Sequence, residues 1–207
     1  MKAEYRKITQ ALNYLAQKAG GSHGFDKTKA IKLLFFADRY HLRKYGRPVT
    51  GDVYLAMNRG PVGAFAKDAA ELSSFLEKDE KDYVEKFISP SSSGQFNYCS
   101  VGDVESDVFS ESDREALDFA IKTFGHLNQW DISKLSHAFP EWKKFEKEAL
   151  EPGGRPAMSY DDFFLDAAEL DPFLRQYMNG KDPFKSETVQ LAHDIFNEAR
   201  EAEKLWA

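Results

Sequence analysis

Two side chains capable of acid–base chemistry, Asp38 and His41, lie three residues apart in a stretch that contains neither glycine nor proline. In a helix this spacing places them on neighbouring positions of one side, where they can share a ligand or join one hydrogen-bond network. A second carboxylate, Asp52, and a guanidinium, Arg59, follow in the next segment. These residue types suit either a hydrolase-type proton-transfer site or a buried structural network.

The neighbours of Asp38 favour the structural interpretation. At 100° per residue its carboxylate lies in the middle of an apolar stripe, which is formed by Ile31, Leu34, Phe35, Leu42 and Tyr45. A carboxylate on a buried face must accept hydrogen bonds, because an unpaired buried charge is strongly destabilising. We therefore expect no catalytic residue and interpret four residues as a structural polar kernel: Asp38, His41, Asp52 and Arg59. The alternative is a hydrolase-type enzyme centred on Asp38 and His41, which requires a solvent-open cleft there.

Other residues that bind metals or act as nucleophiles are scattered along the chain. His126 and His137 have no cysteine or carboxylate at a metal-like spacing, and Cys99 is the single cysteine. The adjacent Ser136 and His137 cannot easily form the hydrogen bond of a catalytic triad. The phosphate-binding, dinucleotide-binding and zinc-protease motifs are absent from the sequence. We expect neither a metal nor a cofactor.

Length and composition indicate one well-packed core. The 207 residues are 42% hydrophobic and include 17 Phe and 9 Tyr, which argues against disorder. No apolar run reaches the length needed to cross a bilayer, and the N-terminal residues do not resemble a signal peptide. A single cysteine fits a reducing compartment. We expect a cytoplasmic protein without a membrane partner.

The net charge of −6 conceals an asymmetry along the chain. Residues 1–60 contain 12 Lys and Arg against 4 Asp and Glu, whereas the remaining residues contain 16 basic and 30 acidic side chains. Either the two halves complement each other within the fold, or the basic end faces an acidic partner or phosphates.

The segment from Lys27 to Val62 is predicted to organise the fold. Its first part, Lys27–Tyr45, should be a central helix that Asp26 caps and Gly46 ends. A short strand is predicted over Asp52–Met57. Apolar periodicity predicts further helices over Glu4–Lys18, Val62–Leu76, Asp113–Phe124, Glu141–Ala149 and Glu187–Leu205, and a β-hairpin over Tyr83–Ile88 and Gln95–Val101. The charged run Glu77–Asp82 is interpreted as a solvated turn, Ser112 and Glu115 as a capping box, and Asp131 as the cap of a short helix.

These elements predict a mainly α (α+β) fold, a bundle around a central buried helix with a small three-stranded antiparallel sheet. The strand Asp52–Met57 is expected to join the hairpin in that sheet. The loop Glu151–Pro156 is the clearest break, so we expect a helical domain over residues 1–150 and a helical extension over residues 151–207 packed on it. One side of the final helix should dock on this domain or on a partner, and it carries Val189, Ala192, Ile195, Phe196, Ala199 and Trp206.

A second face of the central helix carries candidate partner-binding residues. Its apolar members, almost opposite the first stripe, are Leu33, Phe36 and Tyr40. The polar residues between the two stripes are Lys32, Arg39 and Arg43. Because aromatic and arginine side chains are enriched at interfaces, we predict that a protein partner binds Phe36, Arg39, Tyr40 and Arg43. On this basis Arg39→Glu should weaken partner binding with little effect on melting.

The run KLLFFADRYHLRKYGRPVTGDVYLAMNRGPV, together with LSHAFPEW at Leu135–Trp142, resembles the Panacea domain of SocA-like, phage-associated antitoxins. The resemblance rests on KLL, Ala-Asp, His-Leu, Gly-x-Pro, Thr-Gly-Asp and a closing Gly-Pro in fixed order, and it covers the chain from Lys7 to Leu150. It implies a mainly helical, non-enzymatic antitoxin that neutralises a cognate protein toxin, encoded beside it, by direct binding. It further implies, from at least one member, a role as proteolytic adaptor for a AAA+ protease.

A nucleic-acid-binding regulator is the remaining alternative. The stripe of Lys32, Arg39 and Arg43, continued by Arg47, offers charges to phosphates, but the chain is acidic overall and lacks a zinc finger or basic zipper. Such a regulator would be retained on DNA in a strongly salt-dependent way.

Overall fold

The central helix, α2 (Lys27–Tyr45), has the bounds predicted from the sequence. It begins where it does because the Asp26 carboxylate accepts a hydrogen bond from the Lys29 backbone N–H at 2.8 Å, which satisfies one of the amides left free at a helix start. It ends because Gly46 adopts a left-handed conformation with a φ of 71°. Every residue from Ala30 to Arg43 except Tyr40 is buried, so α2 is the centre of the molecule.

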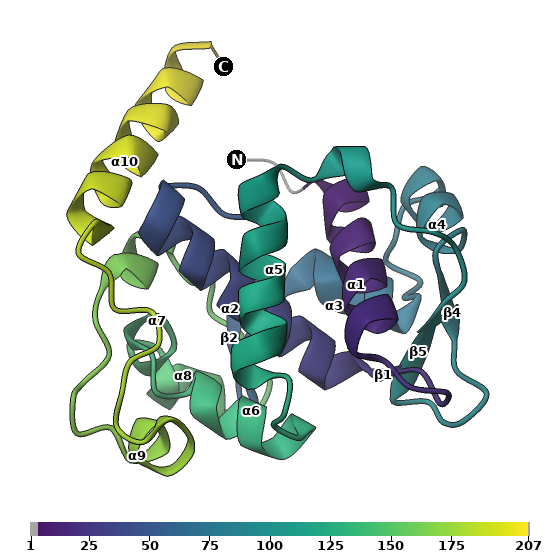
Figure 1. Ribbon diagram of the computed structural model, residues 1–207, viewed down its shortest axis with the longest axis horizontal. Coiled ribbons are helices and arrows are strands. Elements are labelled where there is room, and N and C mark those ends of the chain that lie inside the picture. Colours follow the sequence, from purple (N-terminus) through teal and green to yellow (C-terminus); the bar gives the residue numbers. More distant parts are fainter. Residues whose placement is uncertain (1–3, 207) are drawn as a thin grey trace.

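The computed structural model describes residues 4–206, and in it α2 packs most extensively against five other α-helices (Figure 1). These are α1 (Tyr5–Ala19), α3 (Ala64–Glu71), α5 (Glu111–Phe124), α6 (Gln129–Ser136) and α10 (Val189–Trp206). Shorter helical segments complete the shell: α4 (Lys78–Val84), α7 (Pro140–Lys143), α8 (Glu146–Leu150), α9 (Pro172–Met178), and the 3-10 turns η1 (Ser106–Val108) and η2 (Tyr160–Phe164). The fold is mainly α with a little sheet, as predicted.

Both apolar faces of α2 pack into one core. The Phe35 ring lies 5.5 Å from that of Phe163, and the Phe36 ring lies 4.2 Å from that of Phe124. Aromatic rings in such tilted arrangements bury large apolar areas, which dominate core stability. The core therefore surrounds α2 instead of lying along one side of it.

The three-stranded antiparallel sheet has a different composition from the one predicted. Its strands are β1 (Phe25–Asp26), β5 (Asn97–Ser100) and β4 (Ile88–Pro90), in that order. The predicted hairpin is therefore present with shorter strands, but the strand after α2, β2 (Tyr54–Met57), does not join it. Instead β2 pairs with β3 (Gly60–Gly63), because the two-residue turn at Asn58 and Arg59 folds the chain straight back.

Two helices, α4 and α3, begin at residues that differ from the predictions. The run predicted as a solvated turn opens α4, since the Glu77 backbone N–H donates to the Glu80 carboxylate at 2.9 Å in a reciprocal capping box. Tyr83 consequently belongs to a helix and not to the hairpin. The helix predicted from Val62 begins only at Ala64, after β3.

Two other caps also lie at residues other than those predicted. The box that opens α5 is formed by Ser110 and Asp113, not by Ser112 and Glu115. Asn128, not Asp131, caps α6 by accepting from the amides of the first turn. Ser159 caps η2 by accepting a hydrogen bond from the Asp161 backbone N–H.

The segment after the Glu151–Pro156 loop returns to the central helix. Phe163 and Phe184 lie in the same hydrophobic cluster as α2, and α10 packs beside α2 through Ala192 and Phe196. Ile195 and Ala199, predicted on the docked side, are exposed, and the second half of α10 projects from the body (Figure 1). The Trp206 side chain lies outside the described residues. The division at residue 150 stays a prediction.

Candidate functional site

Asp38 has no exposed surface, and all of its acceptor capacity is used. Its carboxylate accepts from the Val49 N–H at 2.7 Å, the Thr50 N–H at 2.9 Å, the Thr50 hydroxyl, and the Tyr54 hydroxyl at 2.8 Å. Burial raises the pKa of Asp38 to about 6, and these hydrogen bonds oppose that rise. Asp38 therefore fixes the loop that leads from α2 to β2.

His41 binds the start of the same loop and the first turn of α5. Its Nδ1 lies 2.7 Å from the Arg47 carbonyl oxygen and its Nε2 lies 2.9 Å from the Ser112 hydroxyl. Because burial lowers the pKa of His41 to about 4, the ring is neutral, and Nδ1–H donates to the carbonyl while Nε2 accepts from the hydroxyl. Asp38 and His41 thus hold the same loop after α2 at different residues, and His41 also contacts α5.

The Asp52 side chain accepts hydrogen bonds from the start of α3, the helix that follows the β2–β3 hairpin. Its carboxylate accepts from the Phe65 N–H at 3.0 Å and the Ala66 N–H at 2.8 Å, in the first turn of α3. A Cβ at Gly63 would lie 2.5 Å from the same carboxylate, so only glycine fits there. Burial raises the pKa of Asp52, and its backbone hydrogen bonds oppose the rise.

Arg59 is not part of this buried network. It is exposed at the tip of the β2–β3 turn, and its guanidinium lies 5.1 Å from the centre of the Trp130 ring, itself 55% exposed. Three members of the predicted polar kernel are therefore buried, and the fourth lies on the surface beside an aromatic ring.

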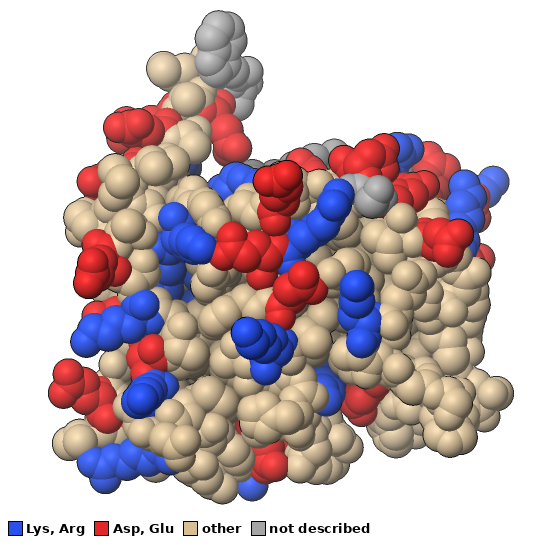
Figure 2. Space-filling view, viewed as in Figure 1, with Lys and Arg blue, Asp and Glu red and all other residues tan. Residues whose placement is uncertain are grey.

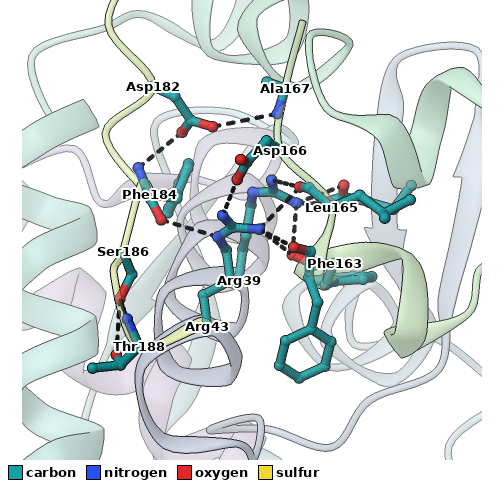
Figure 3. A network of polar contacts seen from close by, with 12 residues as sticks. Arg39, Arg43, Phe163, Leu165, Asp166, Ala167, Asp182, Phe184, Ser186 and Thr188 are labelled. Atoms are coloured by element: carbon teal, nitrogen blue, oxygen red, sulfur yellow. Dashed lines mark hydrogen bonds and ion pairs between the residues drawn. The ribbon is translucent and has the colours of Figure 1, made fainter. Parts of the chain in front are cut away.

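Arg39 is fully buried and binds two distant segments at once (Figure 3). Its guanidinium pairs with the Glu141 carboxylate at 2.6 Å. It also donates to the carbonyl oxygens of Phe163 at 3.1 Å and Leu165 at 2.7 Å. The planar fork of donors lets one side chain bind a buried carboxylate and two backbone carbonyl groups.

Arg43, one helical turn later, extends the same arrangement. It donates to the carbonyl oxygens of Leu165 and Phe184, both at 2.9 Å, to that of Phe164, and to the Asp166 carboxylate (Figure 3). Burial lowers its pKa. Together the two arginines hold the chain around η2 and the loop before α10 against α2.

The predicted exposure of the partner-binding face is therefore wrong for three of its four residues. Phe36, Arg39 and Arg43 are buried under the C-terminal extension, whose carbonyl groups need donors that the arginines supply. Tyr40 alone is partly exposed, and its ring stacks on Phe119 at 4.1 Å. No observation tests whether these residues take part in binding, but in the folded chain the first three are inaccessible.

Several early cations pair with later carboxylates, so part of the charge asymmetry is neutralised within the fold. The pairs are Lys7 and Arg47 with Asp113, Arg39 with Glu141, Arg43 with Asp166, and Lys44 with Glu115. Figure 2 shows charges of both signs interspersed on one face of the molecule. Of the stripe considered for phosphates, Lys32, Arg39 and Arg43 are buried and Arg47 is paired, so it is not a nucleic-acid surface.

The geometry offers little support for a catalytic centre at Asp38. A surface pocket of about 200 Å³ lies beside it, lined by Asp52, Tyr54 and Tyr160 among others, but Asp38 itself is sealed from solvent. Within residues 4–206, no group of three or more His, Cys, Asp and Glu side chains could hold a metal ion. His126 is exposed, and His137 stacks on Trp142 at 3.8 Å.

A family model described as the antitoxin SocA-like Panacea domain matches residues 31–143. The chain belongs to this family. The region that matches the Panacea domain runs from α2 to α7 and includes Asp38, His41, Asp52, Arg39 and Glu141. No curated protein and no solved structure matched the chain. In the described part of this Panacea protein, no helix is long and apolar enough to cross a membrane.

Two features of this Panacea domain were missed from the sequence. One is Glu141, which neutralises Arg39 from a position 102 residues away. The other is the burial of Lys32, which shares a helix face with Phe36, Arg39 and Arg43. The signal available was that this polar stripe is centred on a phenylalanine, which a solvated face does not require.

Proposed function

We propose that this chain is the antitoxin of a toxin–antitoxin pair and that it neutralises a cognate protein toxin by direct, non-catalytic binding. The observation that carries the proposal is the match of the SocA-like Panacea family over residues 31–143. Steric neutralisation needs an interface with a few anchoring side chains and no reacting group.

The geometry around α2 supports a binding role over a catalytic one. The Asp38 carboxylate accepts four hydrogen bonds, and the carboxylates of Asp52 and Glu141 are also engaged by buried donors. Such groups stabilise a fold, and Asp38 has no acceptor site left for a substrate. Recognition of a toxin would then depend on side chains at the surface or lining its grooves, and Tyr40 is the one partly exposed member of the predicted set.

Co-expression with the product of the neighbouring gene tests the proposal. The neighbouring product should arrest growth when it is expressed alone, growth should resume when this chain is induced, and the two proteins should co-purify as a complex. If growth is restored with no complex detectable by size-exclusion chromatography, direct binding is wrong. If the neighbouring product is harmless alone, the antitoxin assignment itself fails for that gene pair.

We further propose that the complex is delivered to a AAA+ protease, in which case this chain acts as an adaptor. The support is the family membership. The half-life of the toxin should shorten when this chain is present in cells that contain the protease and should not change in cells that lack it. Equal toxin half-lives in the two strains would leave occlusion as the mechanism.

A further inference from the structure

A groove of about 350 Å³ lies between the first turns of α2, the β2–β3 hairpin and α3. Its apolar lining comes from Ile31, Met57 and Val62, and its cationic lining from Lys32, Arg59 and Lys67. Lys67 is paired with Glu71 on the same helix at 2.6 Å, and Glu71 also lines the groove. The groove thus combines an apolar floor with an excess of positive charge, on a chain whose net charge is −6.

Lys32 is the unusual member of this groove. Its side chain is 1% exposed, and its ammonium group donates to the carbonyl oxygen of Pro61. Within the described residues, no carboxylate lies within ion-pair distance of it. The other two buried cations of α2 each have a carboxylate partner: Arg39 pairs with Glu141, and Arg43 pairs with Asp166. A buried ammonium group without a counter-ion is costly, and burial accordingly lowers the pKa of Lys32 to about 7.

The rim of the groove has the composition of a binding surface. Arg59 is exposed and lies over the ring of Trp130, which is also exposed. Tryptophan, arginine and methionine are the side chains most enriched at the centres of protein interfaces. None of these residues is required by the network that holds α2 to the C-terminal extension, and all of them lie within the region matched by the family model.

We propose that this groove binds an acidic segment of the protein partner, in which an Asp or Glu carboxylate reaches Lys32 and Arg59 while a neighbouring apolar side chain packs on Ile31, Met57 and Val62. The bound carboxylate supplies the counter-ion that Lys32 lacks within the described chain, so the pair forms in a largely desolvated place where charge complementarity is strong. Lys32 is the specificity-determining residue, and Trp130 covers the edge of the contact. This inference rests on the proposed function only in identifying the partner as the toxin.

The test compares the full-length Lys32→Met variant with the wild type. Methionine keeps the length of the stem and removes the unpaired charge, so the variant should melt at a higher temperature at pH 7. Its affinity for the toxin from the neighbouring gene should nevertheless fall at least 10-fold. Arg59→Glu, at an exposed position, should weaken binding to a similar degree without changing the melting temperature. Lys122→Met on the exposed side of α5 is the matched control and should bind as the wild type does.

A second arm does not depend on the toxin. Wild-type protein is used to select from a library of random peptides displayed on phage, and the enriched peptides should contain Asp or Glu beside a large apolar residue. Their binding should be lost on Lys32→Met and kept on Lys122→Met. If no peptides are enriched, or if binding is insensitive to Lys32→Met, the groove is not the docking site. A toxin that binds wild type and Lys32→Met equally overturns the inference while leaving the antitoxin assignment intact.

Discussion

At the scale of single residues, the buried polar groups of α2 are used in pairs and networks that the fold itself satisfies. Arg39 and Arg43 are cations in the core because each reaches a carboxylate and several backbone carbonyls. Removing one partner of such a network leaves the others desolvated and unpaired, which costs more than the bond itself contributes. Stability, and not partner binding, should therefore respond first to changes at these positions.

Asp38→Ala should lower the free energy of unfolding by about 3 kcal/mol, because four buried donors lose their acceptor. Denaturant unfolding followed by circular dichroism measures the change. Tyr54→Phe removes one of those donors and should cost about 1 kcal/mol. Equal stabilities of Asp38→Ala and wild type would contradict the assigned network.

Arg39→Glu should prevent folding instead of acting on binding alone, which reverses the expectation from the sequence. The new carboxylate would face Glu141 in the core, and the carbonyl groups of Phe163 and Leu165 would each lose one of their two donors. The variant should be insoluble or lack a cooperative thermal transition. A variant that melts like the wild type would show that the arginine is not held as described.

The pH dependence of stability should reveal the unpaired ammonium group of Lys32. Its pKa is about 7 in the folded chain and returns to the ordinary lysine value on unfolding, so the unfolded state binds more protons above pH 7. Stability should consequently rise between pH 7 and 9, by a few kcal/mol at most, as the folded chain loses the buried charge. The groups facing Lys32 are His137, Arg59, Lys67 and Glu71.

Thermal melts of the wild type and Lys32→Met over this pH range isolate the contribution of Lys32. His137, whose pKa is lowered to about 4 by burial and by the neighbouring cations Lys32 and Lys143, does not titrate there. The difference in melting temperature between the two proteins should be largest at pH 7 and shrink towards pH 9. A constant difference would mean that Lys32 does not titrate in that window.

At the scale of helices and strands, some predicted bounds were accurate and others were wrong. The difference depends on whether the local residues give a signal that a sequence pattern can identify. The bounds of α2 were predictable because Asp26 and Gly46 act within a few residues of the helix ends. The strand β3 was missed because the sequence GPVG has no β-branched alternation, and its pairing depends on the turn at Asn58 and Arg59. The start of α4 was missed because a capping box of two glutamates looks like a solvated charge run.

The candidate site was predictable only where its contacts are local. Asp38 and its partners at Val49, Thr50 and Tyr54 lie close in sequence, so a buried Asp followed by a Thr-Gly-Asp loop suggested the network. The partners of Arg39 and Arg43 lie more than 100 residues away, and helical periodicity carries no information about them. For this reason Arg39 and Arg43 were correctly identified as important cations but were predicted to bind a partner, whereas both are buried in the core.

The junction of α2 and α10 depends on Gly46. A Cβ there would lie 2.5 Å from the Ala192 carbonyl oxygen and 2.9 Å from Ile195, in addition to the strain of a φ of 71°. Gly46→Ala should lower stability by about 2 kcal/mol and increase hydrogen exchange in α10. Gly153→Ala, which has a φ of 78° but open space around it, should show the backbone cost alone, about 1 kcal/mol. Identical losses would mean that α10 does not press on Gly46.

At the scale of the whole molecule, the C-terminal extension covers the face of α2 that carries Phe36, Arg39 and Arg43. A chain ending at residue 150 would expose these side chains and lose the carbonyl groups that bind them. We predict that residues 1–150 alone aggregate or lack a cooperative melt, whereas a chain ending at residue 197 keeps the wild-type melting temperature, because residues 198–205 are exposed. A stable, cooperative fragment 1–150 would show that the extension is dispensable.

The long reach of Arg43 also constrains the order in which the protein can form during translation. Its guanidinium donates a hydrogen bond to the carbonyl group of Phe184, which is synthesised 141 residues later. Until the chain has been synthesised past Phe184, this face of α2 cannot be fully enclosed. A chain that ends before Phe184 should therefore lack one of the acceptors that hold Arg43 in the core.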